Sequence, residues 1–287
     1  MGMEGKLVLI TGGTAGIGKQ AALGLLQQGA QVVIVGRNAE KTRGVVEELK
    51  ARSANPKLDY LLADLSSMAQ VRRVAAEFRA KYPRLDVLLN NAGGVFPGRT
   101  TTGEGFERTL ATNHLSFFVL THELLPVLEK SAPARVVNVT SNGHRFFKID
   151  FDDLMAEKSY NMWIQYCRSK AANLLFTREL ARRVNARTIT VNCLHPGFVA
   201  SDFLAKPGFW NLIKPIAYLG AIDETKGAKT SIYLASSPEV EGVTGKYFEK
   251  CAEAKPSAFC RDDAAAKRLW EMTERLVANV GTATRAA

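Results

Sequence analysis

The segment IQYCRSK places a tyrosine and a lysine at a spacing that suits proton transfer. Tyr166 and Lys170 are four residues apart, so on a helix their side chains lie on one face. A free phenol has a pKa of about 10, and only ~0.1% of it is ionised at neutral pH. A neighbouring ammonium group favours the phenolate and lowers that pKa. The pair therefore predicts a general acid/base, although the same spacing also arises by chance on amphipathic helices.

A glycine-rich turn near the N-terminus predicts a site for phosphate groups. Residues 6–29 read as the strand KLVLI, the turn TGGTAGIG and the helix KQAALGLLQQG. Gly12 permits a tight turn, Gly16 lets the backbone approach a pyrophosphate, and Gly18 lets the helix pack closely on the strand. The N–H groups of the helix N-terminus attract the phosphates. The spacing is Gly-x-x-x-Gly-x-Gly, and glycine-rich turns also occur without a cofactor, so the motif depends on its context.

The end of the second predicted strand, AQVVIVGRN, bears on the choice between NAD and NADP. A protein that binds NAD places an acidic residue there, on the ribose 2′-hydroxyl. This chain has Gly36 and Arg37 instead. No carboxylate repels a 2′-phosphate, and a guanidinium is available to pair with one. The pattern favours NADP(H) over NAD(H); the alternative is that Arg37 is a solvated charge at the end of a strand.

Seven motifs occur in the order and spacing of one known family of enzymes. They are TGGTAGIG (11–18), ADLSS (63–67), NNAG (90–93), ATNHLSFF (111–118), RVVNVTSNGH (135–144), YCRSK (166–170) and HPGFVASD (195–202). In these motifs the chain resembles the short-chain dehydrogenase/reductase family over most of its length. Residues 149–183 and the late segment KRLWEMTERL are similar to the retinol dehydrogenase-like branch of that family. Only the residues after Ala278 fall outside the resemblance.

The resemblance implies a catalytic set of four residues, all of which are present. Tyr166 corresponds to the general acid/base, and Lys170 to the group that lowers its pKa and holds the nicotinamide ribose. Ser141 corresponds to the serine that hydrogen-bonds the substrate oxygen. Asn113 corresponds to the asparagine that supports a water linking the lysine to solvent. Thr140 stands where relatives often carry a second serine, and it keeps the hydroxyl.

The chemistry of carbonyl reduction agrees with this set. Hydride addition to the carbonyl carbon leaves a developing alkoxide, which needs hydrogen-bond donors and an acid within reach. Ser141 and Tyr166 can be those donors. In the reverse direction the phenolate removes the alcohol proton while hydride leaves for the nicotinamide. No metal is required.

The same motifs imply contacts with NADP(H) along the chain. Asp64 resembles the aspartate that bonds the adenine amine, with the backbone of Leu65 beside it; a helix N-terminal acid explains Asp64 equally well. Ser201 stands where a threonine commonly meets the nicotinamide carboxamide. The implied cofactor contacts are Gly12, Thr14, Ala15, Gly16, Ile17, Gly18, Arg37, Asn38, Asp64, Leu65, Asn91, Ala92, Gly93, Tyr166, Lys170, Pro196, Gly197, Val199 and Ser201.

Strand-like and helix-like segments alternate along the chain, which predicts an α/β protein with a parallel sheet covered on both faces. A seventh strand is expected near residues 245–250. With the resemblance, this implies a Rossmann-type doubly wound sheet of about seven strands. The 287 residues are 46% hydrophobic, enough for one large domain. We expect a single domain over 1–287, with a core at about 5–250, a substrate lid at about 198–222, a C-terminal helix at about 262–278 and a loose tail at 279–287.

The sequence argues against a membrane anchor and against disulfides. No apolar run reaches the ~18 residues of a membrane span, and the first strand starts by about Lys6, too early for a signal peptide or an N-terminal anchor. This is a departure from those retinol dehydrogenases that carry a hydrophobic N-terminal segment. The four cysteines show no Cys-x-x-Cys spacing. We therefore expect reduced thiols in a cytoplasmic protein.

The formal net charge of +10 raises the question of a nucleic-acid partner. No block of five or more basic residues occurs, and the pairs Arg72–Arg73 and Arg182–Arg183 lie on separate predicted helices. A solvated surface and a phosphate-rich cofactor account for the excess charge, so we expect no nucleic-acid partner. The four histidines show no metal-ligand spacing, so we expect no metal site.

Aromatic residues near the expected lid indicate the class of substrate. The segment FLAKPGFWNLIKPIAYLG interleaves Phe203, Phe209 and Trp210 with aliphatic residues, and an apolar lid suits a lipophilic aldehyde, ketone or alcohol. Phe96, Phe146 and Phe147 lie on other loops expected at the same rim. Two alternatives stay open, because these rings can also pack the lid on the core or a partner subunit, and the segment can graze a bilayer surface.

The sequence thus predicts an NADP(H)-dependent oxidoreductase that interconverts a lipophilic carbonyl and its alcohol, with reduction as the cellular direction. The alternative is a dinucleotide-binding regulatory or scaffold protein that has kept the fold and lost turnover. The four catalytic residues argue against that alternative. A homodimer and a monomer both remain compatible with the sequence.

Overall fold

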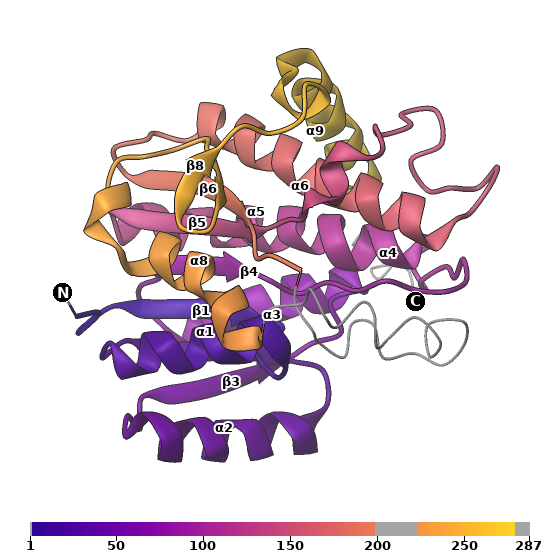
Figure 1. Cartoon of the computed structure of the whole chain (residues 1–287). Coiled ribbons are helices and arrows are strands. Elements are labelled where there is room, and N and C mark those ends of the chain that lie inside the picture. Colours follow the sequence, from indigo (N-terminus) through magenta and orange to yellow (C-terminus); the bar gives the residue numbers. More distant parts are fainter. Residues whose placement is uncertain (1, 199–222, 279–287) are drawn as a thin grey trace.

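A central sheet lies between two layers of helices (Figure 1). The structure, a computed structural model, describes residues 2–198 and 223–278. Within these residues the sheet has eight strands in the order β3-β2-β1-β4-β5-β6-β7-β8, of which β8 alone runs antiparallel to its neighbour. The strands are β1 (Leu7–Thr11), β2 (Gln31–Gly36), β3 (Leu58–Leu62), β4 (Val87–Asn90), β5 (Ala134–Val139), β6 (Ile189–His195), β7 (Tyr247–Glu249) and β8 (Ala252–Ala254).

Helices connect consecutive parallel strands and, together with α9 after the last strand, cover both faces of the sheet (Figure 1). One apolar cluster contains residues of α1 (Gly16–Gln27), α2 (Ala39–Ser53) and α8 (Glu224–Ser236). Another contains residues of α3 (Met68–Lys81), α5 (Ser116–Lys130), α6 (Met162–Arg183) and α9 (Asp263–Ala278). The shorter helical elements are α4 (Arg108–Leu110), the π-helix η1 (Ala111–Leu115) and the 3-10 turns η2 (Asn142–Arg145), η4 (Pro238–Val240) and η5 (Phe259–Arg261). The predicted doubly wound α/β fold is confirmed.

Alternate residues of the central strands pack against opposite helix layers. In β1, Leu7 and Leu9 belong to the cluster of α3, α5 and α6, whereas Val8 and Ile10 belong to the cluster of α1, α2 and α8. All five residues of β1 are buried. A strand covered on both sides needs apolar residues at every position, which explains the continuous apolar runs in the sequence.

The sheet order reverses between β1 and β4. From β1 the chain builds outward through β2 and β3 on one side, and through β4, β5, β6 and β7 on the other. The loops after β1 and β4 therefore diverge to opposite helix layers. In open parallel sheets this switch point, at the carboxyl ends of the strands, is where ligands bind.

The C-terminal edge of the sheet contains a strand that the sequence analysis did not predict. The seventh strand lies where it was expected, at Tyr247–Glu249, and the chain then turns back into β8. The two turn residues, Lys250 and Cys251, have φ values of 51° and 62°. Such a two-residue hairpin usually carries Asn or Gly. Because neither turn residue is Asn or Gly, no sequence signal marks the hairpin.

Some sequence-based expectations fall outside the described residues. The expected lid lies there except for Phe198, and so does the tail at 279–287. Across residues 2–198 and 223–278, no helix has both the length and the apolar character that a membrane span requires. All four cysteines, which are among the described residues, are free thiols.

Helix α9 packs onto the rest of the protein through aromatic rings. The ring of Phe176 in α6 stacks on Trp270 of α9, with 5.9 Å between centroids, and lies 5.6 Å from the ring of Phe118 in α5. The guanidinium of Arg183 lies 4.3 Å from the centre of the Trp270 ring. Phe176 is only 2% exposed. Its side chain therefore joins three helices on one face of the sheet.

We expect Phe176→Ala to lower the free energy of unfolding by about 3–5 kcal/mol, because the truncation leaves a cavity between packed rings. Phe146→Ala is the matched control, since Phe146 is 73% exposed and its truncation leaves no cavity. Urea denaturation of both variants measures the difference. Equal stability of the two variants would contradict the described docking of α9.

Candidate active site

The loops at the switch point are held together by Thr11 and Asn91. The Asn91 side-chain amide donates to the Thr11 carbonyl at 3.0 Å and to the Gly12 carbonyl at 3.3 Å. In return, the Thr11 hydroxyl accepts from the backbone N–H groups of Asn91 and Ala92 at 2.9 and 3.0 Å. The sequence predicts Asn91 as a cofactor contact and gives no role to Thr11. The signal that could have identified Thr11 is its position as a polar residue at the end of the apolar strand β1.

The glycine-rich turn is packed too tightly for larger residues. Gly12 has φ +67° and Gly16 has φ +54°, which are left-handed conformations that glycine adopts readily. A Cβ on Gly18 would lie 2.3 Å from the Gly12 carbonyl oxygen and 2.4 Å from Asn91 Nδ2. Helix α1 therefore begins directly against the end of β1, as the glycine spacing predicts.

The first turn of α1 suits a bound phosphate group. The N-cap residue is Ala15, which provides no side-chain cap, and the first turn holds no acidic residue. Gly16, Ile17 and Gly18 thus carry the N–H groups that a helix N-terminus leaves without an intrahelical partner. These groups, together with the close glycine turn, fit the pyrophosphate of a dinucleotide.

The residues after β2 have both structural and candidate binding roles. A Cβ on Gly36 would lie 2.2 Å from Thr42 Oγ1 and 2.8 Å from Thr14 Cγ2, so the two loops approach closely there. Arg37 is exposed at the end of the strand. Asn38, predicted as a cofactor contact, caps α2 by accepting from the Lys41 N–H at 2.8 Å. This cap is a function that the sequence analysis did not assign.

Asp64 lies after β3 and interacts electrostatically with Arg37. Its carboxylate accepts from the backbone N–H and the hydroxyl of Ser66, at 2.9 and 2.8 Å. Burial acts to raise the pKa of Asp64, but the bonds from Ser66 and the charges of Arg37 and Arg108 outweigh burial and lower it. Asp64 is therefore an anion at neutral pH. The next residue, Leu65, is buried.

Asn113, Lys170 and Gly93 lie close together. The Asn113 amide donates to the Gly94 carbonyl at 3.0 Å and accepts from the Gly94 N–H at 2.8 Å. A Cβ on Gly93 would lie 3.2 Å from both Lys170 Nζ and Asn113 Oδ1. Asn113 belongs to the π-helix η1, a feature often found at functional sites. The structure thus brings together residues that are far apart in the chain, such as Gly93 and Lys170.

Ser169 is a further member of this cluster that the sequence analysis missed. Its hydroxyl donates to the Tyr166 carbonyl at 2.7 Å and accepts from Asn113 Nδ2 at 3.0 Å. Helix α6 is therefore fixed to η1 between the two catalytic candidates. Nothing in the motif spacing signalled this contact, because it depends on how the two helices pack.

The structure brings Ser141, Tyr166 and Lys170 together at the carboxyl end of β5. Lys170 Nζ lies 5.7 Å from the centre of the Tyr166 ring and donates to the Val139 carbonyl at 3.3 Å. Thr140 holds the helix by donating to the Lys170 carbonyl at 2.6 Å. The Ser141 hydroxyl accepts from the Gly143 N–H at 3.1 Å and forms a hydrogen bond with Tyr166.

The pKa of Tyr166 is shifted in the direction opposite to the sequence-based expectation. Burial raises it to about 12, against the lowering effect of the hydrogen bond with Ser141. Burial also lowers the pKa of Lys170 to about 8. Desolvation penalises the charged form of each group, and it is the largest cause of both shifts. At neutral pH the phenol of Tyr166 therefore holds its proton.

The loop after β6 contributes the remaining described candidates. Pro196 and Gly197 are partly buried, and Gly197 has φ +92°. Val199 and Ser201, predicted to meet the nicotinamide, lie outside the described residues. Among the residues with described positions, no group of three or more His, Cys, Asp or Glu side chains is arranged to hold a metal ion.

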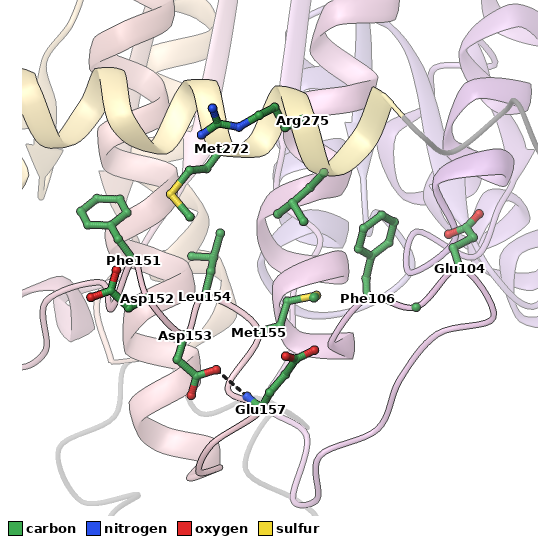
Figure 2. Close-up of a pocket in the computed structure, with 12 residues that line it drawn as sticks. Glu104, Phe106, Phe151, Asp152, Asp153, Leu154, Met155, Glu157, Met272 and Arg275 are labelled. Atoms are coloured by element: carbon green, nitrogen blue, oxygen red, sulfur yellow. Dashed lines mark hydrogen bonds between the residues drawn. The ribbon is translucent and has the colours of Figure 1, made fainter.

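A separate cavity of about 570 Å³ lies beneath α9 (Figure 2). Apolar side chains from α9 and from residues 151–157, such as Met272, Leu154 and Met155, point into it. Two of its carboxylates are already bonded: Glu104 caps α3 through the Met68 and Ala69 N–H groups, and Asp153 accepts from the Glu157 and Lys158 N–H groups. None of its lining residues belongs to the predicted site.

Comparison with known proteins gives agreement along nearly the whole chain. Residues 6–210 match the family model described as short chain dehydrogenase. Retinol dehydrogenase 14 of Mus musculus is 42% identical over 293 residues, covering 96% of this chain and 86% of that protein. Retinol dehydrogenase 12 of Bos taurus is 41% identical over 278 residues, covering 95% and 86%.

Solved structures with the same architecture include an uncharacterised protein from Mycobacterium paratuberculosis. That structure has a TM-score of 0.78 and 28% identity, and the match covers 96% of this chain and 95% of that chain. The Pseudomonas aeruginosa RhlG/NADP active-site complex has a TM-score of 0.69 and 30% identity, covering 90% of this chain and 98% of that chain.

We expect Gly18→Ala to lower the free energy of unfolding by about 1–3 kcal/mol, because the new Cβ would overlap the Gly12 carbonyl. Gly44→Ala is the matched control: Gly44 lies in α2, and a Cβ there meets nothing within 4 Å. A helical Gly→Ala change of this kind should raise stability by about 0.5–1 kcal/mol. Urea titration of both variants gives the two values. A stabilising Gly18→Ala would show that the turn is not packed as described.

Proposed function

The chain belongs to the short-chain dehydrogenase family and is retinol dehydrogenase-like within it, and we propose that it interconverts a lipophilic carbonyl and its alcohol with NADP(H). Family membership makes the chain an oxidoreductase that acts on CH–OH groups with a nicotinamide dinucleotide. The choice of NADP(H), the lipophilic substrate and the role of Tyr166 are the proposal. The observation that carries it is the joint placement of Ser141, Tyr166 and Lys170 at one end of the sheet.

Several residues of this chain would hold the dinucleotide. The uncapped first turn of α1 and the glycine turn fit its pyrophosphate, and the family resemblance assigns the nicotinamide ribose to Lys170. A Cβ at position 93 would crowd the lysine, so glycine keeps that approach open. When bound, the cofactor supplies the hydride, and the protein supplies orientation and electrostatics.

The polar residues of the site would act on the substrate oxygen. Ser141 and Tyr166 are hydrogen-bonded to each other, so their hydroxyls are close together. One carbonyl oxygen placed beside them can therefore accept a hydrogen bond from each. The Gly143 N–H donates to the Ser141 oxygen, and the serine proton, which is directed at Tyr166 in the free protein, would turn to the substrate oxygen once it is bound. As negative charge develops on the substrate oxygen, Tyr166 gives up its proton to that oxygen. A phenol that is protonated at neutral pH suits this reducing direction.

Three exposed phenyl rings support a lipophilic substrate. Phe146, Phe147 and Phe198 are 73%, 40% and 51% exposed, although large apolar side chains are normally covered. Phe146 and Phe147 follow the turn that carries Ser141, and Phe198 follows Pro196 and Gly197. All three therefore extend from the loops that hold the reacting groups. Since the relatives include retinol dehydrogenases, retinal belongs in a substrate screen with medium-chain aldehydes and steroid ketones.

The exposed guanidinium of Arg37 supports the choice of NADP(H). It lies at the end of β2, where no carboxylate precedes it, and its charge reaches Asp64 on the neighbouring loop. A guanidinium pairs well with a phosphate through two parallel hydrogen bonds. The RhlG structure, which resembles this chain, is an NADP complex.

We expect Tyr166→Phe to reduce kcat by about a hundredfold to ten-thousandfold, the usual contribution of a general acid. Oxidation of NADPH with the carbonyl screen measures this loss. Because the phenol holds its proton at neutral pH, carbonyl reduction should dominate there and alcohol oxidation should increase as the pH rises towards the phenol pKa.

Tyr82→Phe is the control for this substitution. Tyr82 bonds Asp59 at the far end of α3, at the amino-terminal edge of the sheet, so its loss should leave kcat unchanged. Turnover that survives Tyr166→Phe would remove Tyr166 from its role. A wild-type protein that turns over none of the carbonyls would favour a dinucleotide-binding regulator.

We expect Arg37→Asp to weaken NADPH binding by about tenfold to a hundredfold and to leave NADH binding nearly unchanged, because a charged hydrogen bond to the 2′-phosphate is replaced by repulsion. Arg43→Asp makes the same change of charge on the exposed side of α2 and serves as the control. Fluorescence titration with each dinucleotide measures binding. An unchanged preference would mean that Arg37 does not meet the phosphate.

A further inference from the structure

The turn that carries Ser141 is held by side chains that lie outside the four catalytic candidates. Ser141 is the N-cap of η2, directly after β5. Its carbonyl oxygen accepts two hydrogen bonds from His144, one from the backbone N–H at 3.2 Å and one from the ring Nδ1 at 2.7 Å. The shorter bond is the one made by the imidazole.

The hydrogen bonds of His144 define its tautomer. A carbonyl oxygen only accepts, so Nδ1 carries the proton that it shares with Ser141. On the other side of the ring, Nε2 lies 3.2 Å from the backbone N–H of Ser257, which only donates, so Nε2 is unprotonated. The imidazole is therefore neutral and connects the Ser141 turn to the segment after β8. It is also 2% exposed, so water does not compete for either nitrogen.

The hairpin of β7 and β8 supports the same turn through Tyr247. The Tyr247 ring meets the His144 ring edge-on, with 5.0 Å between centroids and 75° between planes. The Tyr247 hydroxyl lies 2.9 Å from Asn142 Oδ1 and 2.8 Å from Glu249 Oε1. Arg145 Nε donates to Asn142 Oδ1 at 3.0 Å, and the same guanidinium pairs with Glu249 at 3.2 Å.

A second histidine holds the turn from the side of β6. The ring Nδ1 of His195, the last residue of β6, accepts from the Asn142 N–H at 3.3 Å. Burial lowers the pKa of His195 to about 4, so the ring is neutral at neutral pH, and because an amide N–H only donates, Nδ1 is its unprotonated nitrogen. The backbone of residues 141 and 142 is thus bonded on one side by His144 and on the other by His195.

We propose that His144 is a positioning residue for Ser141, acting through the hydrogen bond from its Nδ1–H to the Ser141 carbonyl. This inference rests on the proposed function, in which Ser141 bonds the substrate oxygen. The imidazole touches no reacting atom; it fixes the backbone from which the serine hydroxyl projects. Rotation of that backbone would move the hydroxyl relative to Tyr166.

The environment of His144 keeps the ring in the required form. Burial lowers its pKa, the bond to the Ser141 carbonyl acts to raise it, Arg145 lowers it further and Glu249 raises it. The net direction is downward, so the ring is neutral under the conditions in which Nε2 accepts from Ser257. Geometry and charge therefore agree on one tautomer.

The test compares four variants of the full chain in the NADPH assay. His144→Phe keeps the ring packed against Tyr247 and removes both nitrogens. His144→Asn offers an amide N–H near the position of Nδ1, and His144→Gln offers an acceptor near the position of Nε2. His122→Phe is the matched control: His122 bonds the Phe118 carbonyl in α5 and packs on Trp270, away from the Ser141 turn.

We expect His144→Phe to reduce kcat by about tenfold to a hundredfold, the effect of a displacement of about 1 Å at a reacting group. KM for NADPH should stay unchanged, since Ser141 faces the substrate oxygen. His144→Asn should restore most of kcat and His144→Gln should not, because the bond to Ser141 is the one that matters. His122→Phe should retain full kcat.

Three results would overturn the inference. Full kcat in His144→Phe would show that the serine needs no such bond. Rescue by His144→Gln in place of His144→Asn would assign the ring to anchoring Ser257. In the third case, kcat falls in all four variants in proportion to their loss of unfolding free energy. His144 would then contribute to stability alone.

The proposed function fails in a different way. It fails when the wild-type protein turns over none of the carbonyls, or when Tyr166→Phe keeps its activity. The inference on His144 is contradicted on its own when the wild type is active, Tyr166→Phe is inactive and His144→Phe remains as active as the wild type.

Discussion

The burial of one ammonium group beside one phenol is the constraint on which the candidate site depends. Lys170 is 4% exposed, and its Nζ donates to the Val139 carbonyl. Removing a charged amine from water is unfavourable, and the cost appears as a pKa lowered to about 8. The same environment raises the pKa of Tyr166 to about 12. Because the surroundings are poorly solvated, any charge or dipole placed there acts strongly on both groups.

Such a site needs rigid neighbours, and buried amides and hydroxyls provide them. Asn113 joins Gly94 to Ser169, Thr140 bonds the carbonyl of Lys170, and Asn91 bonds the end of β1. Each of these contacts joins two segments that are distant in sequence. Buried polar groups that are fully bonded fix one arrangement, whereas partly bonded ones are costly. The positions of Lys170 and Tyr166 therefore depend on loops from several strands.

Features that depend on local rules could be predicted from the sequence. The glycine turn, the alternation of strands and helices and the helical pairing of Tyr166 with Lys170 follow from backbone conformation and residue spacing. Features that depend on packing could not. The side-chain role of Asn91, the cap made by Asn38 and the contact of Ser169 with Asn113 arise only when the elements are assembled. The direction of the Tyr166 pKa was wrong for the same reason, since burial is not visible in a motif.

The C-terminal part of the chain carries more of the site than its motifs suggest. The family model ends at residue 210, and no catalytic motif was recognised beyond it. Yet Tyr247 and Ser257 bond Asn142 and His144 of the turn after β5 that holds Ser141, and Glu249 pairs with Arg145 of the same turn. The β7–β8 hairpin brings Tyr247 and Glu249 there, the segment after β8 brings Ser257, and the hairpin turn has no glycine to signal it. Tyr166 and Lys170 lie on α6, whereas Ser141 is supported from the far edge of the sheet. The distance and angle between the hydroxyls of Ser141 and Tyr166 therefore depend on how the β7–β8 hairpin packs against the Ser141 turn. Substitutions in the hairpin can therefore alter the reaction without touching a reacting atom.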